Sequence, residues 1–221
     1  MELKEYLEKI KTDLQTTPVI GIDYDFDTEY LIWKTIAETR PYGFIIDDLN
    51  RPIIETLIRY WNNDALDPRK GICLAGPNGT GKSELMLCFQ KYVFYRRYRY
   101  FRIESAESLN IKYKIHGAKI IEEYSTNQRE VNIGIYKNKP FDLNICDFGF
   151  QGAARHYGDS EQVIDSILFL RYDLLKKGIR THLTTNLKRE QIEEHYKGRL
   201  NSRFYEMFNW IELKGNDRRK L

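Results

Sequence analysis

The chain has 221 residues, which suits one domain with a short appendage. Its formal net charge of +3 is weak evidence for an anionic partner, and its mean hydropathy is −0.59. No apolar run approaches the roughly 20 residues that span a bilayer, and the charged N-terminus lacks the apolar stretch of a signal peptide, so we expect a cytoplasmic protein without a membrane segment. The three cysteines, Cys73, Cys88 and Cys146, are scattered through apolar surroundings, which indicates buried thiols and not a disulfide framework or a zinc site.

Two helices are predicted near the N-terminus. Residues 1–15 place five apolar side chains on one helical face, and Pro18 ends this helix because proline disfavours helical geometry in the residue before it. The apolar face packs either on the protein's own core or on a partner protein. A second helix is predicted over residues 28–39. We therefore expect an N-terminal helical appendage over residues 1–40, a candidate partner-docking element, and a main domain over residues 41–221.

The next elements lead to a glycine-rich loop. A short strand is predicted over residues 44–46, a helix over residues 50–61 and a turn over residues 67–70. Residues 71–75 then form an apolar strand, and an apolar helical pattern begins after Ser83. The loop between them fits the pattern G-x-x-x-x-G-K-[ST] at every position, in the strand–loop–helix context that the pattern requires.

This loop predicts a nucleoside triphosphate site. Its glycines let the backbone fold around an anion, and the amide groups at the new helix's N-terminus point toward that anion. Lys82 supplies a positive charge for the β- and γ-phosphates, and Ser83 supplies a hydroxyl for Mg²⁺. The predicted binding residues are Gly76, Pro77, Asn78, Gly79, Thr80, Gly81, Lys82, Ser83 and Glu84.

Aromatic residues alternate with arginines over residues 92–102. Stacking faces beside positive charges are typical of single-stranded nucleic acid binding, with Arg96, Arg97 and Arg99 as candidates. Part of the same run is also expected to form the second strand, in which Tyr98 and Tyr100 would merely alternate with the arginines across the sheet. Both interpretations remain open from the sequence.

The remaining pattern alternates helices and strands. Helix is predicted over residues 106–124, a short strand or hairpin over 129–136, a strand over 141–147, a helix over 161–177 and a strand over 179–186. Such alternation predicts an α/β fold with a mostly parallel sheet in three layers. Asp147 ends its strand, and the carboxyl end of such a strand faces the nucleotide, so Asp147 is placed to hold the Mg²⁺ water shell.

An ordered set of motifs covers residues 45–221. They are the phosphate loop, Asp147-Phe148-Gly149, Arg171-Tyr172, Thr184-Thr185-Asn186-Leu187, residues 199–204 and residues 215–219. In this order and spacing they resemble AAA+ ATPases of the DnaC/IstB group, the helicase loaders and transposition helper ATPases. This resemblance implies a P-loop ATPase sheet of the AAA+ type, flanked by helices and without a C-terminal helical lid domain. It also implies ATP and Mg²⁺ as cofactors, with Lys82 and Asp147 in catalysis.

The resemblance assigns roles to further polar residues. Asn186 would be the sensor 1 residue, which contacts the attacking water or the γ-phosphate. Arg203 would be the arginine finger that reaches a neighbouring subunit's nucleotide, with Arg199 as the alternative. Arg219 resembles the sensor 2 arginine, and the adjacent Arg218 could serve instead. A finger implies nucleotide-dependent homo-oligomerisation.

One feature departs from the family pattern. The family strand usually ends in two adjacent acids, and here only one is present. Either Asp147 is the first acid and Phe148 replaces the second, or Cys146 replaces the first and Asp147 is the second. Without a positioned base, hydrolysis falls by about 10²- to 10⁴-fold. We therefore expect a slow ATPase or a binding switch, unless Glu104 or Asp142 substitutes.

The expected function is that of a helicase loader in DNA replication, with single-stranded DNA and a replicative helicase as partners. A transposition helper with a transposase as partner is the first alternative. A small P-loop nucleotide or metabolite kinase is the second, and a nucleotide-binding protein without turnover is the third.

Overall fold

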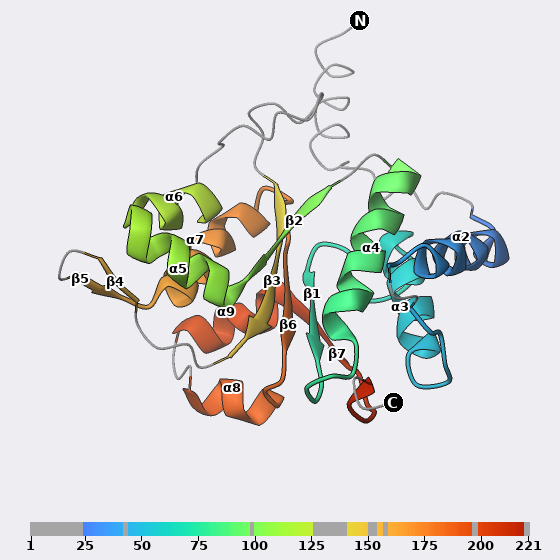
Figure 1. Ribbon diagram of the computed structural model, residues 1–221. Helices are drawn as coiled ribbons and strands as arrows, with labels where there is room; N and C mark the ends of the chain where they lie inside the picture. The colour runs from blue at the N-terminus through green and yellow to red at the C-terminus, as the bar shows by residue number, and fades with distance from the viewer. Residues whose placement is uncertain are drawn as a thin grey trace, which may run out of the picture.

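The structure is a computed structural model that describes residues 24–41, 44–97, 100–125, 141–149, 154–156, 159–195 and 199–218. A parallel sheet lies between two layers of helices in this part of the chain (Figure 1). In chain order the elements are α2 (Phe26–Glu38), α3 (Arg51–Trp61), β1 (Gly71–Ala75), α4 (Lys82–Arg97), β2 (Phe101–Ser105), α5 (Ala106–His116), α6 (Lys119–Ser125), β3 (Asp142–Phe148), β4 (Ala154–His156), β5 (Asp159–Glu161), α7 (Val163–Leu175), β6 (Thr181–Thr185), α8 (Arg189–His195), α9 (Arg199–Met207) and β7 (Phe208–Glu212).

The main sheet has five strands in the order β2-β3-β6-β1-β7, and all four pairings are parallel. Strand β6 therefore lies between β1, which leads into the phosphate loop, and β3, which carries Asp147. The short strands β4 and β5 form a separate antiparallel pair. This topology confirms the predicted parallel α/β sheet and brings the carboxyl ends of β1, β3 and β6 to one edge.

Each face of the sheet is covered by its own helices (Figure 1). Helices α2, α3 and α4 pack on one face, where Ile72 of β1 belongs to the same buried cluster as Trp33 and Phe89. Helices α5, α6 and α7 cover the other face, together with residues of α8 and α9, around Ile145 and Leu183. Three layers result, as the sequence predicts.

Helix α2 belongs to this core, although it lies in the segment expected to form an appendage. Its Trp33 side chain is fully buried, and the ring centroid lies 5.9 Å from that of Phe89 and 5.3 Å from that of Tyr92. The predicted docking helix over residues 1–15 lies outside the described residues, so the division at residue 40 stays a prediction.

Two predicted strands are wrong in part. Residues 44–46 are not a strand, and Ile45 is 76% exposed, because both neighbours of β1 are already supplied by β6 and β7. The aromatic run over residues 92–102 is mostly helical, since α4 continues to Arg97 and buries Tyr92 and Val93. Strand β2 begins only at Phe101, so Tyr100 is not part of a strand alternation.

The helical region predicted over residues 106–124 consists of two helices. Ser105 caps α5 by accepting a hydrogen bond from the Ser108 N–H at 3.0 Å. Gly117 then ends α5 with a φ of 62°, a conformation that favours glycine. The strand or hairpin predicted over residues 129–136 lies outside the described part.

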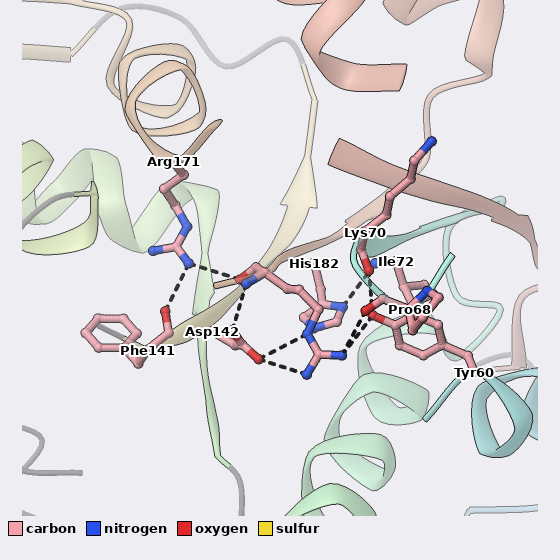
Figure 2. Close-up of polar contacts among 9 residues, drawn as sticks. Tyr60, Pro68, Lys70, Ile72, Phe141, Asp142, Arg171 and His182 are labelled. Atoms are coloured by element: carbon pink, nitrogen blue, oxygen red, sulfur yellow. Dashed lines mark hydrogen bonds and ion pairs between the residues drawn. The ribbon is translucent and has the colours of Figure 1, made fainter. Parts of the chain in front are cut away.

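A buried arginine fixes the amino ends of β3 and β6 (Figure 2). The Arg171 guanidinium donates hydrogen bonds to Thr181 Oγ1 at 2.6 Å and to the carbonyl oxygens of Phe141 and Arg180, each at 3.0 Å. Arg180 in turn pairs with Asp142 at 3.2 Å. These contacts stabilise the sheet at the end opposite the phosphate loop.

Over the described residues, every helix is too short or too polar to cross a bilayer.

Candidate nucleotide site

The loop between β1 and α4 makes a turn that requires glycine at two points. Gly79 has a φ of 76°, and a Cβ atom on it would lie 1.8 Å from Asp217 Oδ1. A Cβ atom on Gly76 would lie 2.2 Å from the carbonyl oxygen of Leu213. A side chain at Gly76 would therefore require the backbone to move, and one at Gly79 would require a strained φ and a shift of the Asp217 side chain. The loop therefore has the tight strand–loop–helix form on which phosphate binding depends.

Lys82 begins α4, and its side chain folds back over the loop. Its ammonium group donates hydrogen bonds to the carbonyl oxygens of Gly76 at 2.7 Å and Pro77 at 2.8 Å. The Thr80 hydroxyl also donates to the Pro77 carbonyl, at 2.9 Å. The positive charge thus lies beside the helix N-terminus, where the partial charges of the backbone already favour an anion. These residues fit a bound phosphate chain.

Other predicted loop residues have more peripheral places. Pro77 and Asn78 are exposed at the loop surface. Glu84 is also exposed and forms an ion pair with Arg40 at 2.9 Å. This pair joins the first turn of α4 to the end of α2. Glu84 therefore has a structural partner here in addition to its predicted place beside the nucleotide.

Two threonines at the end of β6 hold the neighbouring strand ends together. Thr184 Oγ1 accepts a hydrogen bond from the Asp147 N–H at 3.0 Å, and Thr185 Oγ1 donates to the Phe148 carbonyl at 2.6 Å. The Gly76 N–H donates to the Thr185 carbonyl at 3.0 Å. The carboxyl ends of β1, β3 and β6 are thus linked directly below the loop. Asn186, the sensor 1 candidate, follows immediately and is exposed.

Strand β3 contains an irregularity that decides which side chain faces the loop. Its register against β6 shifts between Ile145 and Phe148, and Asp147 has a φ of 56°. Ile145 and Phe148 lie three residues apart yet both pack into the α5–α9 side, which strict alternation along a strand would not allow. The bulge leaves Asp147 exposed at the strand end.

The side chain that meets Ser83 is Cys146. This thiol is 7% exposed, accepts a hydrogen bond from Asn144 Nδ2 at 3.0 Å, and lies within hydrogen-bonding reach of the Thr184 and Ser83 hydroxyls. Burial is the main cause that raises the pKa of Cys146, so the thiol is neutral at pH 7. Of the two alignments left open by the sequence, this geometry favours the one in which Cys146 replaces the first acid and Asp147 is the second. The assignment of Asp147 as a Mg²⁺ ligand stays a prediction.

Neither of the two carboxylates named as substitutes is placed at the loop. Asp142 lies at the other end of β3, where it accepts a hydrogen bond from the Arg180 N–H at 2.7 Å (Figure 2). Glu104 lies on β2, which β3 and β6 separate from β1, and it binds Lys112 at 2.7 Å and the Tyr124 hydroxyl at 2.7 Å. The expectation that either one supplies the missing acid is wrong, because both are held by other partners away from Ser83.

Arg203 packs on the outer side of α7. Its guanidinium carbon lies 3.8 Å from the Phe169 ring centroid and 4.6 Å from that of Tyr172, and it donates a hydrogen bond to the Phe169 carbonyl at 3.3 Å. An arginine finger acts on a neighbouring subunit, so this role stays a prediction. Arg199 begins α9, the helix that also carries Arg203, and the side chain of Arg199 lies outside the described part.

Sequence reasoning missed a cluster in which the C-terminal segment meets the phosphate loop. The Arg218 N–H donates to the Gly79 carbonyl at 2.9 Å, and its guanidinium pairs with Asp47 at 2.6 Å. Asp47 and Arg218 are 171 positions apart (218 minus 47), so no local pattern could reveal the pair. Arg219, the first choice for sensor 2, lies outside the described residues.

Of the three candidates for nucleic acid contact, only Arg96 has a described side chain. It forms an ion pair with the buried Glu29 at 2.5 Å, and Tyr92 donates to the same carboxylate at 2.7 Å. This contact ties α4 to α2, so the charge of Arg96 is largely neutralised within the protein. The side chain of Arg97 and all of Arg99 lie outside the described part.

Comparisons with known proteins find similarity in structure. A scan against models of protein families finds no match, and a comparison with curated proteins finds none either. The crystal structure of the DnaC helicase loader is similar with a TM-score of 0.50 and 17% identity, over 79% of this chain and 95% of that one. AMPPCP-bound DnaA from Aquifex aeolicus has a TM-score of 0.55 and 19% identity, over 82% of this chain and 52% of that one. A DNA replication initiation factor has a TM-score of 0.56 and 19% identity, over 81% and 51% of the two chains. The described chain therefore has the AAA+ P-loop fold that the resemblance implies.

Proposed function

We propose that this protein is an ATP-binding AAA+ ATPase that acts in DNA replication as a helicase loader. It either hydrolyses ATP slowly or works as a nucleotide-binding switch. The observation that carries the proposal is the phosphate loop at the N-terminus of α4, with Lys82 folded over it and the ends of β3 and β6 linked below it. The fold shared with DnaC supports the choice of helicase loader over the kinase alternative.

The residues of this chain would divide the work as follows. The loop amides and Lys82 bind and orient the phosphates, and Ser83 would hold Mg²⁺. Bound Mg²⁺ and ATP would supply the metal and the phosphoanhydride bond that is hydrolysed. Asp147, which lies exposed at the end of β3, would accept a proton from water, and Asn186 would orient that water.

Slow turnover follows from the neutral thiol beside Ser83. A carboxylate at that point would fix the charge and water shell of a divalent ion, and Cys146 cannot do so as a thiol. The loop that binds phosphate is complete, so we expect nucleotide binding to be weakened less than hydrolysis. We infer that the nucleotide-bound form is long-lived and suited to a switch.

The partners are inferred from the same resemblance. Single-stranded DNA and a replicative helicase are the proposed partners, and Arg203 would act across the interface of a nucleotide-dependent homo-oligomer. A transposition helper with a transposase as its partner would share this ATPase core. Binding of purified replicative helicase, compared with binding of transposase, separates the two functions.

The first experiment measures nucleotide binding and turnover by purified protein. We expect ATP to bind with Mg²⁺, and Lys82→Ala to weaken binding at least about tenfold, since it removes the only side-chain charge of the loop motif. Turnover is expected to stay well below about one per second, the low end of typical enzymes, and to rise with single-stranded DNA. Failure of the unmodified protein to bind any nucleoside triphosphate would overturn the proposal, and turnover of several per second would overturn its slow-hydrolysis part.

A further inference from the structure

The C-terminal segment over residues 213–218, called the strap here, follows β7 and runs along the phosphate loop. The Leu213 N–H donates to the Ala75 carbonyl at 2.7 Å, and the Leu213 carbonyl lies against Gly76. At the far end, Asp217 packs against Gly79, and the Arg218 N–H donates to the Gly79 carbonyl at 2.9 Å. The strap thus contacts the beginning and the apex of the loop.

An ion pair fastens the end of the strap to the start of α3. Arg218 pairs with Asp47 Oδ2 at 2.6 Å and donates to the Ile45 carbonyl at 3.4 Å. The other carboxylate oxygen of Asp47 accepts the N–H groups of Leu49 and Asn50, each at 3.0 Å. Burial acts to raise the pKa of Asp47, but the hydrogen bonds from Asn50 and Arg218 outweigh it, so its pKa is lowered. The carboxylate is therefore charged at neutral pH.

The contact with Gly79 has a consequence for its peptide bond. In a trans peptide the C=O group and the following N–H group point in opposite directions. A strap that holds the Gly79 carbonyl therefore turns the Thr80 N–H away from itself. Amide groups of this part of the loop are those that bind phosphate at a helix N-terminus.

We propose that the ion pair between Asp47 and Arg218 is a clamp that positions the phosphate loop for nucleotide binding. The clamp needs no contact of either residue with the nucleotide, although Arg218 is also the alternative candidate for the sensor 2 arginine. Both act through the strap, which holds Gly79 and thereby the direction of the Thr80 amide. This inference rests on the proposed function, because it concerns how tightly that site binds ATP.

The clamp predicts a different outcome from plain electrostatic attraction. If Arg218 only attracted the phosphates, removal of its partner's negative charge would strengthen ATP binding. If the pair is a clamp, loss of either charge loosens the strap, so Asp47 and Arg218 variants weaken binding alike. Asp47→Asn is well suited to the test, since it keeps the oxygen that accepts Leu49 and Asn50 and replaces only the one that meets Arg218.

The experiment measures the Kd for Mg²⁺-ATP of the full chain and of Asp47→Asn, Arg218→Gln and the double variant. We expect about a two- to fivefold weaker Kd in each single variant, the range that a partly exposed ion pair supports. The double variant should be no weaker than the single ones, because the second change removes nothing further. Glu55→Gln, which breaks an ion pair of 3.0 Å with Arg51 on α3, is the matched control and should leave the Kd unchanged.

The outcomes separate this inference from the proposed function. Without ATP binding by the unmodified protein, the proposed function fails and the clamp fails with it. With normal binding by the unmodified protein, an equal or tighter Kd for Asp47→Asn overturns the clamp alone. Additive losses in the double variant also overturn it. Melting without nucleotide checks that each variant is folded, and Arg218→Met, which also lacks the charge, replaces Arg218→Gln if the latter unfolds, with a weaker Kd again expected.

Discussion

The thiol beside Ser83 allows a gain of activity to be designed. Cys146→Asp places a carboxylate where Sγ now lies 3.0 Å from Asn144 Nδ2 and near the Thr184 and Ser83 hydroxyls. Three donors are thus available, so we expect the buried charge to cost only about 1–3 kcal/mol of folding free energy before nucleotide binds. With Mg²⁺-ATP bound, the new charge gains a divalent partner through its water shell.

The expected gain in turnover follows from this charge. An ion interaction of about 3 kcal/mol at the metal corresponds to about a 100-fold faster step. Steady-state ATP hydrolysis at saturating ATP, titrated with Mg²⁺, measures both the rate and the metal requirement. Cys146→Asn is the matched control, since asparagine has the shape of aspartate without its charge, and it should give no gain.

Two results would refute this reasoning. If folded Cys146→Asp binds Mg²⁺-ATP and hydrolyses it no faster than the unmodified protein, the missing carboxylate is not what limits turnover. If Cys146→Asn accelerates hydrolysis as much as Cys146→Asp, the effect comes from shape and not from charge. Asp147→Asn in the Cys146→Asp background should abolish the gain if Asp147 is the second acid.

Three other changes test separate parts of the structure. Arg203→Ala should abolish turnover stimulated by single-stranded DNA while leaving ATP binding intact, and equal stimulation in the variant would remove the finger assignment. Arg96→Ala leaves the buried Glu29 carboxylate without its ion pair, so urea unfolding should show a loss of about 2–3 kcal/mol; an unchanged midpoint would contradict the structural role given to this arginine. His182 is fully buried, and burial together with the positive charge of Arg180 lowers its pKa to about 3. As the pH falls below about 6.5, His182 takes up a proton in the unfolded chain but stays neutral in the folded protein. The free energy of unfolding should therefore decrease by about 2 kcal/mol between pH 6.5 and pH 5. His182→Gln should remove this part of the pH dependence in denaturant melts.

Local sequence patterns sufficed for the elements that depend on neighbouring residues. The phosphate loop, its strand and its helix follow from glycine, lysine and serine at fixed spacing, and the parallel sheet follows from alternating apolar periods. The apolar triplet at residues 44–46 predicts a strand wrongly, because three apolar residues say nothing about whether a sheet edge is free. The aromatic residues in the run over residues 92–102 suit either a strand or a long helix. Burial of Tyr92 on the α2–α4 side selects the helix.

Tertiary structure alone decided the chemistry around Ser83 and the contacts of the strap. Counting along the sequence leaves Cys146 and Asp147 equivalent, because strand alternation predicts a face only while the register is regular. The bulge after Ile145 breaks that regularity and leaves the thiol toward α4. The pair between Asp47 and Arg218 likewise forms only when the chain ends meet at the phosphate loop. The sequence by itself thus determined that a phosphate site exists, and long-range packing decided which side chains surround it.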